Sequence, residues 1–164
     1  MVRIVKSMKE LNFYSLMEVY AQTNLETARQ QWPQESEYRG LMLAEEDFRS
    51  YLSQVFFRTP DAMYAIWEEG GRYISALRLE PYRDGLLLAA LETAPGERRK
   101  GYAVQLIRAA LDAIAGTPVY AHVAKGNLPS RKTHEACGFV KILDYGVYAD
   151  GSVFHTSVTY CHKS

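Results

Sequence analysis

The fold of this chain is decided by one stretch, Leu86-Leu87-Leu88-Ala89-Ala90-Leu91-Glu92-Thr93-Ala94-Pro95-Gly96-Glu97-Arg98-Arg99-Lys100-Gly101-Tyr102-Ala103-Val104. Its apolar start lacks polar alternation, which predicts a strand buried on both faces in the middle of a sheet. Its end is a basic turn with a glycine that leads into a helical pattern. Amide groups in a first helical turn have no intrahelical partner, and the helix dipole favours an anion there. The stretch therefore predicts a strand, a phosphate-binding turn and a helix in succession.

Apolar periodicity extends this unit into a single α/β domain over residues 1–164. We expect strands at 2–6, 63–67, 72–82, 86–93, 119–123, 140–148 and 153–160, and helices at 13–20, 45–55, 103–114 and 130–137. The strand–helix–strand unit that begins at residue 86 predicts a crossover between parallel strands. Residues 24–43 lack clear periodicity and are predicted to form a long loop that touches the substrate. The element order is βααβββαβαββ, with a mixed central sheet of about seven strands and about four helices.

Composition excludes several classes of protein. The 164 residues include 48% hydrophobic and 23% charged residues, as in an ordinary soluble domain. Because 19 basic residues balance 19 acidic ones, we expect neither a nucleic acid nor a membrane surface as partner. The charged N-terminus does not resemble a secretory signal, and no apolar run is long enough to span a membrane. The two cysteines form no disulfide framework, so we expect a cytoplasmic protein.

A second motif follows the crossover unit, Asn127-Leu128-Pro129-Ser130-Arg131-Lys132-Thr133-His134-Glu135-Ala136-Cys137-Gly138-Phe139. It resembles the signature N-x-x-[AS]-x-x-[LF]-Y-E-K-x-G-F of the GNAT superfamily of N-acetyltransferases. The pattern Arg98-x-x-Gly101-x-Ala103 resembles the acetyl-CoA pyrophosphate loop of the same superfamily, R/Q-x-x-G-x-G/A. The two motifs span residues 86–139, and the order of elements around them fits the GNAT fold. By this resemblance the chain is identified as a GNAT N-acetyltransferase.

The resemblance implies acetyl-CoA as cosubstrate and a set of residues that bind it. The pyrophosphate would lie on the backbone amides of residues 99–104, with charge added by Arg98 and Lys100. The side chains of Asn127 and Ser130 would hold the pantetheine arm or its neighbouring phosphate, and the arm would run along residues 91–93. The predicted cofactor-binding residues are Leu91, Thr93, Arg98, Arg99, Lys100, Gly101, Tyr102, Ala103, Val104, Asn127 and Ser130.

Two residues are candidates for catalysis. Glu92 stands three residues before Pro95, and some GNAT acetyltransferases of aminoglycosides and small amines have a similar strand-end glutamate that binds or deprotonates the amine. The alternative for Glu92 is a solvated carboxylate or a structural ion pair. His134 stands where the family most often has a tyrosine that protonates the departing sulfur, and its reference pKa is about 6.5 against about 10 for tyrosine. The alternative for His134 is a surface histidine, tolerated because a thiolate leaves readily.

The leading hypothesis is an N-acetyltransferase that acts on a primary amine of a small molecule or protein, by direct attack in a ternary complex. The alternative is a non-catalytic acyl-CoA sensor or interaction module on the same fold, which the missing tyrosine keeps open. No metal site is expected, because His134-x-x-Cys137 has no second ligand pair. The acceptor amine and the acyl chain stay open, and a homodimer is compatible with the resemblance.

Overall fold

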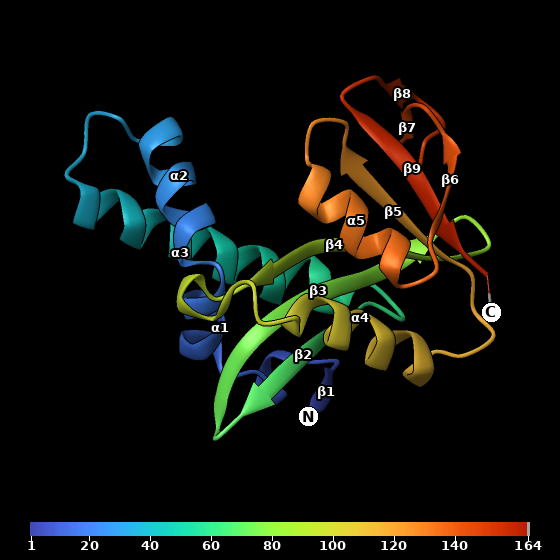
Figure 1. The fold of residues 1–164 in the computed structure, drawn as a ribbon. Coiled ribbons are helices and arrows are strands. Elements are labelled where there is room, and N and C mark those ends of the chain that lie inside the picture. The colour runs from blue at the N-terminus through green and yellow to red at the C-terminus, as the bar shows by residue number, and fades with distance from the viewer. Residues whose placement is uncertain (164) are drawn as a thin grey trace.

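A seven-stranded mixed sheet forms the centre of the computed structural model, which describes residues 1–163 (Figure 1). Only β4 and β5 are parallel neighbours, and every other neighbouring pair is antiparallel. The mixed sheet of seven strands and the parallel crossover are therefore confirmed. Across the sheet the strands are β1 (Val2–Val5), β2 (Met63–Glu69), β3 (Arg72–Tyr82), β4 (Gly85–Thr93), β5 (Val119–Ala124), β9 (Ser157–His162) and β6 (Val140–Leu143).

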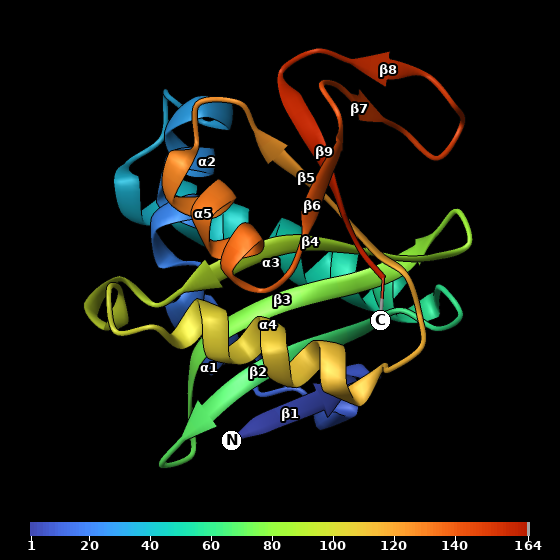
Figure 2. The same ribbon diagram turned by 45° about the vertical axis from the view of Figure 1, so that its right-hand side comes forward.

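Helices cover both faces of this sheet, as the two ribbon views show (Figures 1 and 2). On one face lie α1 (Phe13–Val19), α2 (Ala21–Gln31) and α3 (Glu37–Gln54), and on the other α4 (Tyr102–Ala113) and α5 (Leu128–Ala136). Short 3-10 turns cover Met8–Glu10, Phe56–Arg58 and Pro95–Glu97. Each helical layer buries its own apolar cluster against the sheet. In the described part of the chain, no helix combines the length and the apolar character that a membrane crossing requires.

The long loop predicted for residues 24–43 is wrong, because α2 and α3 occupy most of it and leave only residues 32–36 as connection. Helix α2 buries only Asn24 and Ala28, so its sequence carries almost no apolar period. Helix α3 begins where Ser36 caps it, with its hydroxyl accepting from the Arg39 amide at 3.1 Å. Gly40 lets the two helices approach, since a Cβ there would lie 3.3 Å from the Cβ of Ala28. The chain thus has one α-helix more than predicted.

The C-terminal hairpin is confirmed as an antiparallel return, but its predicted strands are interrupted. Strand β6 ends at Leu143, and the chain then leaves the sheet to form a separate ribbon of β7 (Gly146–Val147) and β8 (Val153–Phe154) before β9. At the break, the Thr159 hydroxyl donates to the Tyr145 carbonyl at 2.7 Å. A side-chain bond thus links β9 to the chain just beyond the last paired residue of β6.

Strands β4 and β5 separate toward their carboxyl ends. They pair only over Leu86–Leu88 and Val119–Ala121, after which β4 pairs with β3 alone and β5 with β9 alone. The prediction that the whole apolar strand is buried on both faces is therefore wrong. Leu86 and Leu88 are buried, but Leu87 within the paired part and Leu91 beyond it are only half-buried. The separation opens the sheet at the place where the chain runs from β4 into the glycine turn.

Candidate active site

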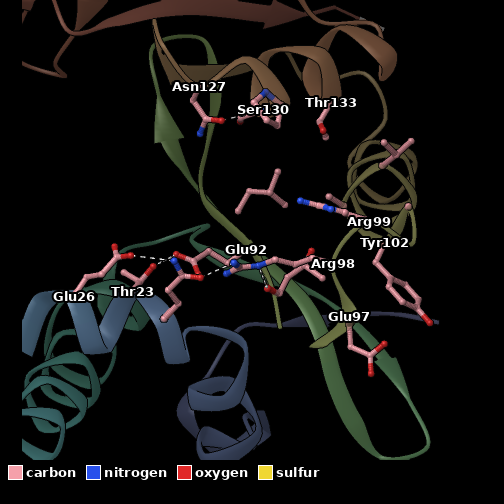
Figure 3. A pocket seen from close by; sticks show the side chains of 17 residues that line it. Thr23, Glu26, Glu92, Glu97, Arg98, Arg99, Tyr102, Asn127, Ser130 and Thr133 are labelled. Atoms are coloured by element: carbon pink, nitrogen blue, oxygen red, sulfur yellow. Dashed lines mark hydrogen bonds between the residues drawn. The ribbon is translucent and has the colours of Figure 1, made fainter. Parts of the chain in front are cut away.

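A cavity of about 750 Å³ lies beside the end of β4. Four parts of the chain line it: the first turns of α2, the end of β4, the turn that leads into α4, and the start of α5 (Figure 3). The lining residues are Gln22, Thr23, Glu26, Leu91, Glu92, Thr93, Glu97, Arg98, Arg99, Gly101, Tyr102, Ala103, Val104, Asn127, Pro129, Ser130 and Thr133. Of the residues predicted from the sequence to form the site, all but Lys100 and His134 lie in this wall.

One end of the cavity is the N-terminus of α4. Arg99 and Gly101 have left-handed backbone conformations, with φ of 64° and 82°, which turn the chain sharply into the helix. The first intrahelical bond runs from the Gln105 amide to the Gly101 carbonyl at 3.1 Å. The amides of residues 102–104 precede that bond and have no partner within the helix. This end of the cavity therefore offers free backbone donors and the positive end of a helix dipole to an anion.

The three basic residues of the turn have different roles. The Arg99 side chain extends into the cavity (Figure 3). Arg98 is held by two acceptors: its Nη1 donates to Gln22 Oε1 at 2.5 Å and its Nε to the Thr93 carbonyl at 3.3 Å. Lys100 lies outside the lining, with its Nζ 2.7 Å from Glu97 Oε2. Arg99 is thus the side chain placed to add charge beside the α4 amides, and Arg98 connects the turn to α2.

Helix α5 supplies the opposite wall. Asn127 caps this helix, because its Oδ1 accepts from the Ser130 amide at 3.2 Å. The cap fixes the Asn127 side chain at the cavity and leaves its Nδ2 group as a donor. Ser130 and Thr133 follow at helical spacing on the same wall (Figure 3). The predicted pair Asn127 and Ser130 is therefore brought to the same cavity as the α4 amides.

Glu92 lies at the end of the cavity away from α4 (Figure 3). Its Oε1 accepts a hydrogen bond from the Thr23 hydroxyl, and its Oε2 is buried without a partner among the described residues. Burial is the main cause that raises the pKa of Glu92, while the Thr23 hydrogen bond and the charge of Arg98 oppose the rise. A carboxylate with a raised pKa and a free oxygen can accept a proton from a group bound in the cavity.

Helix α2 contributes the residues that the sequence did not reveal. Gln22 accepts from Arg98, and its Nε2 donates to Glu26 Oε1 at 3.1 Å. Thr23 donates to Glu92, so the helix contacts both the turn and the strand end. The region predicted to touch the substrate does reach the cavity through Glu26, although it does so as a helix. Apart from its polar character, α2 carries no motif that could have indicated this.

His134 lies in a separate, smaller cavity of about 190 Å³ between the diverging strands, which shares Leu91, Asn127 and Ser130 with the larger one. Its side chain is only 3% exposed. Its Nδ1 lies 2.8 Å from the Ser130 carbonyl, and because a carbonyl only accepts, Nδ1 carries the proton. Its Nε2 is buried without a partner among the described residues. Burial lowers the pKa of His134, which favours the neutral ring.

No group of three or more His, Cys, Asp or Glu side chains that could hold a metal ion occurs among residues 1–163. The cysteines Cys137 and Cys161 are both free and buried. The polar groups that line the larger cavity are amides, hydroxyls, carboxylates and guanidinium groups.

Residues 14–139 match the family model described as "Acetyltransferase (GNAT) family". The chain belongs to this family. No curated protein sequence matches the chain. Among solved structures, this GNAT chain is similar to PaiA N-acetyltransferase from Thermoplasma acidophilum in complex with coenzyme A, with 15% identity, a TM-score of 0.61, and coverage of 100% of this chain and 99% of that one.

Two further structures with this fold differ in the acceptor that their names state. One is the N-acetyltransferase from Escherichia coli named for an alanine of a ribosomal protein, with 15% identity, a TM-score of 0.61, and coverage of 99% and 94% of the two chains. The other is a spermidine N-acetyltransferase chimera that derives in part from Vibrio cholerae, with 21% identity, a TM-score of 0.53, and 75% of each chain covered. At these identities the similarity establishes the fold.

Proposed function

We propose that this GNAT protein transfers an acetyl group from acetyl-CoA to a primary amine, by direct attack of the amine on the thioester in a ternary complex. One observation supports the proposal: a single cavity holds the free amides at the start of α4 at one end and, at the other, the carboxyl group of Glu92, whose pKa is raised by burial. The first end fits the pyrophosphate of acetyl-CoA, and the second fits an amine.

The positions of the cavity residues indicate how acetyl-CoA would be oriented in the cavity. The amides of residues 99–104 and the Arg99 guanidinium would hold the pyrophosphate, and Asn127 and Ser130 would contact the pantetheine arm. The arm would then follow residues 91–93 toward the separation of β4 and β5. The bound coenzyme A in the structure from Thermoplasma acidophilum supports this assignment of the ligand class. When bound, acetyl-CoA supplies an acetyl group on a thiolate leaving group.

Glu92 would act on the acceptor. A primary amine is protonated near neutral pH and must lose a proton before it can attack a carbonyl carbon. Glu92 would take that proton on its carboxylate, which the hydrogen bond from the Thr23 hydroxyl to Oε1 would hold in place. The amine nitrogen then forms its bond to the acetyl carbon, and the bond from that carbon to sulfur breaks. The nitrogen loses its second proton as the amide forms, and one proton neutralises the departing thiolate.

His134 would donate a proton to the departing sulfur, but only while its ring is protonated. Since Nδ1 donates to the Ser130 carbonyl, His134 can give a proton to the thiolate only from Nε2, and only after Nε2 has been protonated. Because burial lowers the pKa of His134, this protonated form becomes scarcer as the pH rises toward and above neutrality.

The His134→Phe variant tests this role. A general acid contributes about 100-fold or more, but a thiolate leaves with little help, so we expect kcat to fall about tenfold. The loss should shrink as the pH rises, because the wild-type ring is then already neutral. Steady-state rates from pH 5.5 to 8.5 measure the effect. A rate equal to that of the wild type at every pH would remove His134 from the mechanism.

Release of the CoA thiol across a panel of primary amines tests the whole proposal. The panel should contain polyamines, aminoglycosides, amino acids and peptides with free N-termini or lysines, each with acetyl-CoA. We expect thiol release above background hydrolysis with at least one amine, and an N-acetylated product by mass spectrometry. Binding of acetyl-CoA without turnover on any amine would instead support an acyl-CoA sensor on the GNAT fold.

A further inference from the structure

Strand β4 contains a bulge next to the active site. Opposite the single residue Leu77 of β3, β4 places two residues, Ala90 and Leu91, between the pairs Arg78–Ala89 and Ala76–Glu92. Ala90 has a left-handed backbone conformation with φ of 51°. A residue with a Cβ rarely adopts this conformation, and it persists only where the surroundings hold it.

The bulge determines on which face of the sheet the side chains at the end of β4 lie. Side chains alternate between the two faces of a sheet, so one extra residue reverses the face of every residue that follows it. Without the bulge, Glu92 would move to the face opposite the one it occupies. Its position beside Thr23 and in the cavity wall therefore depends on the backbone at Ala90.

One side chain holds the bulged residue. The hydroxyl of Tyr20 donates to the Ala90 carbonyl at 2.6 Å, and Tyr20 is only 2% exposed. Burial raises the pKa of Tyr20 well above its usual value, so the hydroxyl keeps its proton and remains a donor. A bulge leaves its extra residue outside the regular ladder, so the carbonyl of the half-buried Ala90 needs a partner from outside the strand pair. The Tyr20 hydroxyl supplies that partner.

Tyr20 also stands where α1 ends and α2 begins. Gln22 and Thr23, whose side chains bond to Arg98 and Glu92, lie two and three residues after it. The bond from Tyr20 to Ala90 thus fixes the start of α2 against β4. The Thr23–Glu92 bond joins the same two segments a few residues further toward the C-terminus of each.

We propose that Tyr20 is a positioning residue, whose hydroxyl holds the bulge at Ala90 and thereby places Glu92 at the acceptor end of the cavity. This inference rests on the proposed role of Glu92. Tyr20 does not line the cavity and acts through the backbone of β4.

The variant Tyr20→Phe isolates the hydroxyl. The ring would keep its contacts with Phe48 and Tyr64, whose ring centroids lie 5.2 and 6.5 Å away. We expect kcat/KM for the amine to fall between about 10- and 100-fold, as a misplaced catalytic group causes. Because the α4 amides are not involved and only the pantetheine contact along residues 91–93 can change, the Kd for CoA should rise much less than kcat/KM for the amine falls.

Tyr82→Phe is the matched control. Tyr82, the last residue of β3, is also buried, and its hydroxyl also donates to a backbone carbonyl at 2.6 Å, that of Val147 in β7. Both variants lose a hydrogen bond from a tyrosine hydroxyl to a backbone carbonyl, and Tyr82→Phe also loses the 3.4 Å contact with His122 Nε2, so Tyr82→Phe should lose at least as much thermal stability. Only Tyr20→Phe should lose activity. Equal activity of the two variants would overturn the inference.

Two further variants separate positioning from general damage. In a Glu92→Gln background, Tyr20→Phe should cause no more than about a twofold further loss, because the residue that it positions no longer takes the proton. The double variant Tyr20→Phe/Ala90→Gly should recover part of the lost rate, since glycine adopts φ of 51° without strain. A further loss in the Glu92→Gln background as large as in the wild type would contradict the inference.

A structural measurement keeps this test independent of turnover. Backbone NMR shifts of residues 90–93 should change strongly in Tyr20→Phe and hardly at all in Tyr82→Phe. If the wild type transfers acetyl to no amine, the proposed function fails, and the shifts still decide whether Tyr20 holds the bulge. Unchanged shifts of residues 90–93 in Tyr20→Phe would overturn the inference even in an active enzyme.

Discussion

The Glu92→Gln variant should lose about 100-fold in kcat for the amine, which is the usual contribution of a general base. Glutamine has nearly the same shape and retains an oxygen that can accept from Thr23, so the geometry of the wall is preserved. What it loses is the ability to take a proton. The Kd for CoA should remain that of the wild type, because the α4 amides that we propose to bind the cofactor lie at the other end of the cavity.

The proposed role of Glu92 also predicts in which direction the rate changes with pH. The carboxylate acts as a base only when it is ionised, so the wild-type rate should fall as the pH decreases through the pKa of Glu92. Burial raises this pKa above its usual value, and the acid limb should therefore lie above the range of an ordinary glutamate. Rates measured from pH 4.5 to 8 should show this limb in the wild type and its absence in Glu92→Gln.

The melting temperature shows whether Glu92→Gln has lost only its proton acceptor or also its folded structure. A carboxyl group whose pKa is raised by folding destabilises the folded state once it is ionised, that is, at pH above its unfolded pKa. Glu92→Gln should therefore keep or raise the melting temperature at pH 7.

The control Glu80→Gln removes a half-buried carboxylate from the neighbouring strand β3 and should leave kcat within about twofold. A Glu92→Gln enzyme as fast as the control would exclude Glu92 as the base.

The parts of the site that the sequence predicts are those with local signals. The apolar run of β4, the glycine before α4 and the periodic apolar residues of α4 each specify their own conformation. Gly101 has the φ of 82° that the turn needs, and Asn127 caps the helix that its motif begins. Strand, turn and two helix starts were therefore predictable, and with them most of the cavity lining.

The remaining parts depend on contacts between distant residues. Helix α2 buries too little apolar surface to show a period, and it is held by α3 and by bonds to Arg98 and Glu92. The bulge at Ala90 arises from pairing with β3, and nothing in the run of leucines and alanines indicates it. The burial of His134 comes partly from Tyr160, whose ring stacks on it from β9. Such contacts have no signal within any one segment.

The variant Gly101→Val should raise the Kd for CoA between about 10- and 100-fold. Gly101 has φ of 82°, and a left-handed conformation costs a residue with a Cβ about 1–2 kcal/mol, more when it is β-branched. The space around the position is open, since a Cβ would meet only Gln105 Nε2 at 3.9 Å. The strain would be relieved by rotation of the backbone, which turns the amides of residues 102–104 away from the pyrophosphate.

Gly71→Val is the control with the same strain at another place. Gly71 lies in the turn between β2 and β3 with φ of 77°, and a Cβ at this position would meet no heavy atom within 4 Å. Both variants should lose about 1–2 kcal/mol of unfolding free energy. Only Gly101→Val should bind CoA more weakly in isothermal titration calorimetry, and its kcat at saturating acetyl-CoA should remain near that of the wild type. Equal CoA affinity in the two variants would show that the cofactor does not depend on the α4 turn, and the pyrophosphate would then have to be sought elsewhere in the cavity.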